Sequence, residues 1–174
     1  AHGPVLRDTP EYYVRSYSQL SSVSAGRDQQ RKILRVFYLS AYGNTRAMAE
    51  VIVAGAESLG GVHVSLHDLE ACANAPLSDL VEDADGIVVG SPTINGDAVS
   101  PVWDFLASLN AIELRGKLGA AFGSYGWSGE AVPFIEERLR NLKFRVPLSG
   151  TRARLIPTPE ELAECRKLGV ELAK

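Results

Sequence analysis

Apolar and polar residues along the chain follow two different spacings, and each change of spacing marks the end of a predicted element. Short runs rich in β-branched and aromatic residues are typical of strands, whereas apolar positions three or four residues apart are typical of helices. Strands are predicted at residues 33–39, 62–69, 85–91 and 117–124, with a fifth, interrupted strand region at 144–157. Helices are predicted at residues 45–60, 99–109, 131–144 and 158–174.

The alternation of strands with helices predicts a parallel sheet, because parallel neighbours need a crossover connection that covers the sheet. The run at residues 85–91 is almost continuously apolar, as expected of a strand buried on both faces. We therefore predict an α/β fold for residues 32–174, with a five-stranded parallel sheet and helices on both faces.

Residues 1–31 have a different pattern. A candidate helix face runs through apolar and aromatic positions between Tyr13 and Leu20, with Pro10 near its first turn. Residues 21–31 then have the polar, small-residue composition of a flexible linker. There is no initiator methionine, which is typical of a fragment or a processed product. We place a boundary near residue 31.

Composition narrows the class of partner. The 174 residues carry a formal net charge of −3, without a basic stripe, so neither a nucleic acid nor an anionic membrane is expected as a partner. No apolar run is long enough for a membrane span, and no signal or transit peptide is recognisable. Cys72 and Cys165 lie far apart and form no metal motif, which predicts a reducing, cytoplasmic location.

Three loops follow predicted strands and carry the candidate chemistry: residues 40–45 (the first loop), 91–96 (the second loop) and 123–129 (the third loop). The carboxyl ends of parallel strands meet at one edge of the sheet, where ligands of such folds bind. We therefore expect the three loops to form one site.

The first loop has the properties of an anion site. A helix is predicted to begin there, and its free N–H groups attract a phosphate, to which Ser40, Asn44 and Thr45 can add donors. The loop contains no lysine and does not match the glycine patterns of nucleoside-triphosphate or dinucleotide sites. A bound monophosphate is one interpretation; an ordinary helix cap made by Asn44 or Thr45 is the other.

The second and third loops suit a flat ring. Tyr125 or Trp127 can stack on a planar heterocycle, while the neighbouring glycines let backbone amides approach it. In the second loop, Thr93 and Asn95 offer polar groups to a ring edge and Gly96 permits a positive φ. The alternatives are an aromatic plug that closes the sheet end and plain turn chemistry.

At these loops the chain resembles the flavodoxin-like family. The stretches FYLSAYGNTRAMAE, ADGIVVGSPTING, PVWDFL and AAFGSYGWSGEAV are similar to the flavodoxin domain of flavodiiron proteins, which reduce dioxygen or nitric oxide. The resemblance covers residues 32–174 and implies a three-layer sandwich with strand order 2-1-3-4-5. AHGPVLRD at the N-terminus resembles the end of the metallo-β-lactamase-like di-iron domain that precedes the flavodoxin domain in that family.

The resemblance implies FMN as the cofactor and no catalytic residue in this chain. Residues 1–31 would be the remnant of the di-iron domain, in which His2 would be a ligand of a metal centre that is otherwise absent from this chain. His63 and His67 are expected at the surface instead. The implied FMN-binding residues are Ser40, Ala41, Tyr42, Gly43, Asn44, Thr45, Pro92, Thr93, Ile94, Asn95, Gly96, Ser124, Tyr125, Gly126, Trp127, Ser128 and Gly129.

The family also implies the partners. Electrons would come from an NAD(P)H-linked reductase or a small redox protein and pass to a di-iron site, in a neighbouring subunit of a head-to-tail oligomer. In a photosynthetic eukaryote the location would be the chloroplast stroma. Two departures stand out: Ile94 replaces a frequent aromatic residue, and Asp97 brings a negative charge toward the flavin, which would lower its potential.

Three alternatives stay open. A free-standing flavodoxin would be an electron carrier alone. An FMN-dependent NAD(P)H:quinone reductase would be an enzyme on the same fold. A binding module without flavin would stay colourless.

Overall fold

The computed structural model describes residues 31–72, 77–112 and 114–174. Most of the predicted remnant of a di-iron domain, with its helix, its linker and His2, lies outside these residues. The strands are β1 (Lys32–Tyr38), β2 (Val62–Asp68), β3 (Gly86–Gly90), β4 (Thr93–Ile94), β5 (Asp97–Ala98), β6 (Leu118–Tyr125) and β7 (Thr151–Arg154). The helices are α2 (Asn44–Glu57), α3 (Leu77–Glu82), α4 (Ser100–Ser108), α5 (Ala131–Asn141) and α6 (Pro159–Ala173).

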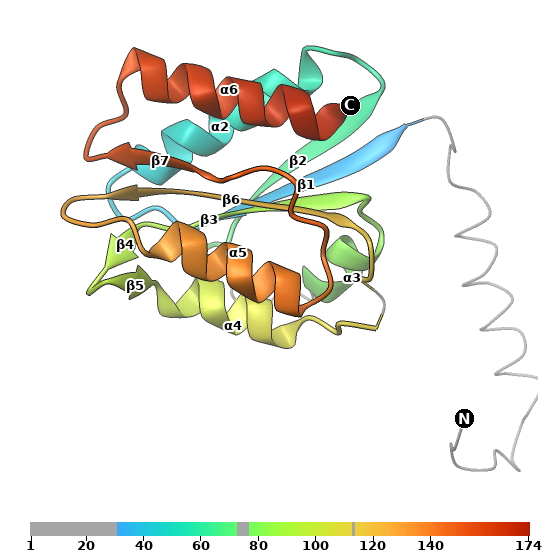
Figure 1. Ribbon diagram of the computed structural model, residues 1–174. Coiled ribbons are helices and arrows are strands. Elements are labelled where there is room, and N and C mark those ends of the chain that lie inside the picture. Colours follow the sequence, from blue (N-terminus) through green and yellow to red (C-terminus); the bar gives the residue numbers. More distant parts are fainter. Residues whose placement is uncertain (1–30, 73–76, 113) are drawn as a thin grey trace, which may run out of the picture. The chain divides into compact units, whose positions relative to one another are not determined.

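Five parallel strands form one sheet in the order β2-β1-β3-β6-β7. Strands β4 and β5 pair only with each other, so β6 and β7 are the fourth and fifth strands of this sheet. Counted in this way, the order is 2-1-3-4-5, as the resemblance implies. The register aligns Val36 of β1 with Leu66 of β2 and with Val88 of β3. Helices α2 and α6 cover one face of the sheet, and α3, α4 and α5 cover the other (Figure 1). The fold class is the one predicted.

The two faces have separate cores because strand side chains alternate. Val36 and Val88 point toward α2 and α6, where Met48 and Ile52 pack against them. Phe37 points to the opposite face and packs among the residues of α4 and α5. Every residue of β3 is buried, as the apolar run predicted.

Helices α2 and α6 pack at close range through glycines. A Cβ on Gly55 would collide with the backbone carbonyl of Arg166, and one on Gly169 would collide with that of Ile52. The short distance between the helices holds α2 firmly over β1, with its first turn at the carboxyl edge of the sheet. Helix α6 begins as predicted, with Thr158 and Glu161 forming a capping box and Pro159 in the first turn.

Two elements were not predicted from the sequence. Helix α3 has only six residues, too few for a periodic pattern. The β4–β5 hairpin begins in the second loop and ends just beyond it, at Ala98; it turns at Asn95 and Gly96, whose φ angles are 53° and 75°. Two positive φ angles at an Asn-Gly pair are typical of a type I′ hairpin turn.

Candidate functional site

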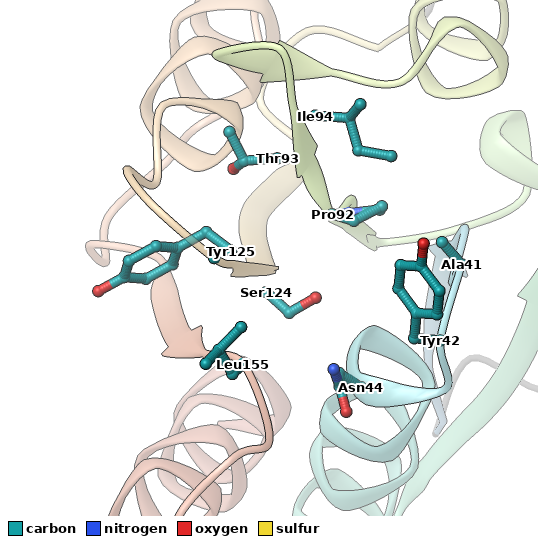
Figure 2. Close-up of a pocket in the computed structure, with 10 residues that line it drawn as sticks. Ala41, Tyr42, Asn44, Pro92, Thr93, Ile94, Ser124, Tyr125 and Leu155 are labelled. Atoms are coloured by element: carbon teal, nitrogen blue, oxygen red, sulfur yellow. The ribbon is translucent and has the colours of Figure 1, made fainter.

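The three loops meet at the carboxyl edge of the sheet and enclose one pocket (Figure 2). Its volume is about 160 Å³. Drug-sized ligands usually occupy about 300–1,000 Å³, so this pocket can hold part of such a ligand while the rest lies across its mouth. The lining residues are Ala41, Tyr42, Asn44, Pro92, Thr93, Ile94, Ser124, Tyr125, Gly126 and Leu155.

The first loop leaves the start of α2 open. Gly43 is the residue that precedes the helix, its φ is 83°, and no side chain caps the helix from this position. The Ser40 hydroxyl accepts a hydrogen bond from the Arg46 amide at 3.2 Å. The first amides of a helix have no partner within the helix, and for those of Asn44 and Thr45 the described part of the chain supplies no other acceptor. These two amides are free to bind an anion.

The hydroxyl groups of Thr45 and Ser124 contact each other instead of capping the helix. Their oxygens are 2.9 Å apart, and both side chains are almost fully buried. No cap by Asn44 or Thr45 is present in the structure; the Ser40 hydroxyl accepts from the Arg46 amide of the first turn and leaves the amides of Asn44 and Thr45 open. The Thr45–Ser124 contact joins the start of α2 to the end of β6.

The second loop is more constrained than a simple turn. The Ser91 hydroxyl accepts from the Val99 amide at 3.2 Å and donates to the Pro92 carbonyl at 2.8 Å, which closes the base of the hairpin. The Thr93 hydroxyl lies 3.4 Å from the Ala131 amide at the start of α5. These bonds fix Pro92 and Thr93 at the pocket wall.

Asp97 does not line the pocket. Its Oδ1 accepts hydrogen bonds from the indole N–H of Trp103 at 3.1 Å and from the Ala98 amide at 2.7 Å. The carboxylate is thus bound toward α4. The expectation that Asp97 acts on a bound flavin stays a prediction, and this geometry weakens it.

The two aromatic residues of the third loop, Tyr125 and Trp127, differ in where their rings lie. Trp127 is 97% exposed, so it forms no plug over the sheet end. Tyr125 lines the pocket, but Figure 2 shows its ring directed away from Ser124 and Tyr42. Tyr42, from the first loop, is 90% exposed at the opposite wall of the pocket. Two rings are therefore nearly unburied: Tyr42 at the pocket wall, and Trp127 on the third loop outside the pocket lining.

Positive charge lies along the third loop. The Arg154 Nε donates to the Gly126 carbonyl at 3.3 Å, and the stem of Arg152 lies over Gly129. Among the described residues, neither guanidinium forms an ion pair with a carboxylate. Glu130 directly follows the loop, and hydrogen bonding with the Ser128 side chain lowers the pKa of its carboxyl.

Most of the pocket lining had been assigned from the sequence. The residues of the three loops that line it were all predicted to bind FMN, and Leu155 is the one that was not. Leu155 follows β7, and its amide donates to the Tyr125 carbonyl at 2.7 Å. The sequence signal that could have identified Leu155 as a lining residue is its position directly after the fifth strand, at the same edge of the sheet. The remaining predicted residues, Ser40, Gly43, Thr45, Asn95, Gly96, Trp127, Ser128 and Gly129, belong to the same loops but do not line the pocket.

The prediction that both histidines lie at the surface is right for His63 and wrong for His67. His63 is exposed, but His67 is half-buried and stacks on Phe37 with ring centroids 5.1 Å apart. His2 lies outside the described residues.

Comparison with known proteins decides the family. The flavodoxin family model matches residues 36–169. The chain belongs to the flavodoxin family. A solved archaeal flavodoxin covers 81% of this chain, with 96% of its own length matched, a TM-score of 0.71 and 39% identity.

Longer proteins also contain this flavodoxin domain. A type A flavoprotein of Rhodobacter capsulatus is 52% identical over 174 residues, and a flavo-diiron protein of Clostridium acetobutylicum is 34% identical over 176 residues. The alignments cover 99% and 100% of this chain but only 40% and 44% of those proteins. The structure of the Giardia intestinalis flavodiiron protein matches 95% of the chain over 40% of its own length, with a TM-score of 0.75 and 26% identity. The chain thus spans about two fifths of these relatives.

The pocket fits the FMN of a flavodoxin domain. Two free helix amides and the hydroxyls beside them suit its phosphate, and the exposed rings of Tyr42 and Trp127 suit its flat isoalloxazine. When bound, FMN supplies a carrier of one or two electrons. Among the described residues, none of the helices is both long and apolar enough to cross a membrane.

Proposed function

We propose that this chain is the electron-transfer domain of a flavodiiron-type oxidoreductase, which reduces dioxygen to water or reduces nitric oxide. The observation that carries the proposal is the full-length match of the chain to two fifths of a type A flavoprotein, together with a pocket built for FMN. The di-iron centre would belong to the other part of such a protein, with His2 as one of its ligands.

The residues of the three loops divide the work of holding FMN. The first loop would bind the phosphate through the amides of Asn44 and Thr45. The second loop would support one edge of the ring through Thr93 and the backbone of the β4–β5 hairpin. Tyr42 and Trp127 would cover the ring faces. No residue of the chain needs to act as an acid, a base or a nucleophile.

The surface around the pocket supports a protein partner. Leu155 and Ile156 are 58% and 78% exposed next to the pocket, and Arg152 and Arg154 add positive charge beside them. Apolar surface edged by charge is typical of transient docking sites. We propose that this surface meets an electron-donating reductase or small redox protein, and the di-iron domain of a neighbouring subunit in a head-to-tail oligomer.

Both free cysteines, Cys72 and Cys165, support a cytoplasmic setting.

The test uses the longer protein that contains this domain, loaded with FMN and iron and reduced anaerobically. Mixing with dioxygen, and separately with nitric oxide, should oxidise the flavin within the catalytic turnover time, while the FMN-loaded chain alone should react much more slowly. Equal rates for the chain alone and the longer protein would contradict the proposal.

A second candidate is a free-standing flavodoxin, because the archaeal flavodoxin matches this chain over 96% of its own length. The intact mass of the native protein, measured in its source cells, separates the two. A mass close to 18.7 kDa would favour the free carrier. An FMN-dependent quinone reductase would instead reveal itself by rapid oxidation of NAD(P)H with quinone, without any partner protein.

A further inference from the structure

Two neighbouring carbonyl groups of the third loop are held from the side of β7. The Tyr125 carbonyl accepts a hydrogen bond from the Leu155 amide at 2.7 Å, and the Gly126 carbonyl accepts one from Arg154 Nε at 3.3 Å. Arg154 is the last residue of β7, and Leu155 directly follows it. The sequence placed neither of these two donors in the FMN site.

The amides of the same two peptide units point the opposite way. In a planar trans peptide unit the C=O and N–H groups lie on opposite sides, and the described residues contain no cis peptide bond. The N–H groups of Gly126 and Trp127 therefore point away from β7. Strand β6 lies between β7 and β3, and β3 leads into the second loop, so this is the side on which the pocket lies. Figure 2 shows Pro92 and Leu155 on opposite sides of the end of β6.

Within the described part of the chain, neither of these amides has an acceptor. No hydrogen bond runs from the N–H of Gly126 or of Trp127 to another backbone group or to a side chain. Gly126 lines the pocket and has no side chain to cover its amide. Two successive free N–H groups on one side of a turn can bind an acceptor atom, above all one that carries negative charge.

Arg154 is itself held in place by helix α6. Glu161 Oε1 accepts a hydrogen bond from the Arg154 amide at 3.1 Å, and its Oε2 accepts one from the Thr158 amide at 2.8 Å. These backbone bonds lower the pKa of the Glu161 carboxyl. The capping box of α6 therefore also fixes the residue whose guanidinium reaches the third loop.

We propose that Arg154 is a positioning residue, which turns the amides of Gly126 and Trp127 toward the pyrimidine edge of a bound flavin ring. That edge carries carbonyl oxygens, and reduction of the ring adds negative charge to it, so donors placed there favour the reduced form. The guanidinium acts through the Gly126 peptide unit, because it holds the carbonyl and polarises the unit. The proposal rests on FMN binding at this pocket and adds a residue that sets the affinities for oxidised and reduced FMN.

The first experiment follows the two amides by ¹⁵N-resolved NMR, with FMN and with riboflavin as probes. In the unmodified chain, the amide proton resonances of Gly126 and Trp127 should shift downfield when either flavin binds. In Arg154→Met, which removes the guanidinium and keeps an unbranched stem, both shifts should be much smaller. Because the amides act on the ring that the two flavins share, both dissociation constants should rise by the same factor, up to about tenfold.

The second experiment measures the midpoint potential of the FMN-loaded chain. A hydrogen bond to a charged acceptor is worth about tenfold to hundredfold in affinity, more than one to a neutral acceptor. Arg154→Met should therefore weaken the binding of reduced FMN more than that of oxidised FMN, and the midpoint potential should fall. Thermal unfolding of the flavin-free variants shows whether the fold is retained.

Arg152→Met is the matched control. It removes the same charge from the same exposed side of β7, but the structure gives Arg152 no hydrogen bond to the third loop. It should leave the two amide shifts unchanged. Any change in potential that it causes through its charge should disappear in about 1 M salt, where the Debye length is about 3 Å, whereas the effect of Arg154→Met should persist.

Three results would contradict the account in different ways. If folded Arg154→Met keeps the amide shifts and the dissociation constants of the unmodified chain, Arg154 does not position the loop. If the two methionine variants lower the potential equally and both effects disappear in salt, charge alone acts and the proposal is overturned. If the unmodified chain binds neither flavin, the FMN site itself is wrong and the proposal falls with it.

Discussion

The Trp103 indole donates a hydrogen bond of 3.1 Å to the Asp97 carboxylate and thereby orients it toward α4. Asp97 is exposed, and water screens its charge. The sequence had suggested that this charge would lower the potential of a bound flavin. The geometry predicts instead that Asp97→Asn changes the midpoint potential of the FMN-loaded chain little.

Spectroelectrochemical titration checks this prediction. Trp103→Phe serves as a comparison, because it removes the indole donor and leaves the carboxylate in place. A rise in potential of several tens of millivolts in Asp97→Asn would mean that the carboxylate acts on the flavin after all.

Gly43 provides a second prediction, on the backbone of the first loop. Its φ of 83° is one that other residues adopt at a cost of about 1–2 kcal/mol. Gly43→Ala should lower the free energy of unfolding by about that amount and should also weaken FMN binding, because it disturbs the free amides at the start of α2.

Gly60→Ala is the control for this effect. Gly60 has a φ of 68°, and like Gly43 it has open space where a Cβ would be placed, but it lies beyond the other end of α2. A similar loss of stability with unchanged FMN affinity is expected. If both variants weaken FMN equally, the effect is one of general stability.

The positive charges of Arg152 and Arg154 lead us to predict that anionic and cationic oxidants react differently with the flavin. Small oxidants of opposite charge report the local electrostatic potential: ferricyanide is an anion and hexaammineruthenium(III) is a cation. At low ionic strength, Arg152→Gln with Arg154→Gln should slow oxidation of the reduced chain by ferricyanide several-fold and speed oxidation by hexaammineruthenium(III). Both changes should disappear in about 1 M salt, where the Debye length is about 3 Å.

Arg115→Gln removes a positive charge near the amino end of β6, at the opposite edge of the sheet. This variant should leave the rates of oxidation by ferricyanide and by hexaammineruthenium(III), both measured by stopped flow, unchanged within error. Rates that are insensitive to the two arginines would show that they do not face the flavin.

His67 predicts a pH dependence of stability. Burial, and then the nearby Arg35 guanidinium, lower the pKa of His67 below its usual value of 6.5. The unfolded chain therefore takes up a proton at a higher pH than the folded chain, and stability is lost as the pH falls below about 6.5. Urea unfolding should show that the free energy of unfolding decreases less between pH 7.5 and pH 5.5 in His67→Gln than in the unmodified chain.

His63→Gln is the matched control here, since His63 lies on the same strand and is exposed. It should keep the pH dependence of the unmodified chain. An unchanged dependence in His67→Gln would contradict the assignment.

Much of the fold could be predicted because local patterns determine it. The buried run of β3 and the Thr158 cap of α6 are local features, and both appear as predicted. The β4–β5 hairpin was missed although Asn95-Gly96 is a strong turn signal, because its strands have only two residues each.

The details of the site depend on contacts that no local pattern encodes. The Thr45–Ser124 pair joins residues 79 positions apart, and the Leu155–Tyr125 hydrogen bond joins the ends of two strands. The direction of the Asp97 carboxylate depends on Trp103, which lies on the following helix. A list of loop residues could therefore be predicted, but not the partner of each side chain.

Titration of the purified, flavin-free chain with FMN tests the central claim most directly. The account predicts saturable binding of one FMN per chain, with quenching of flavin fluorescence and a shift of the flavin absorption bands. A chain that is fully folded by circular dichroism and leaves the FMN spectrum and fluorescence unchanged at a large excess of FMN would contradict it.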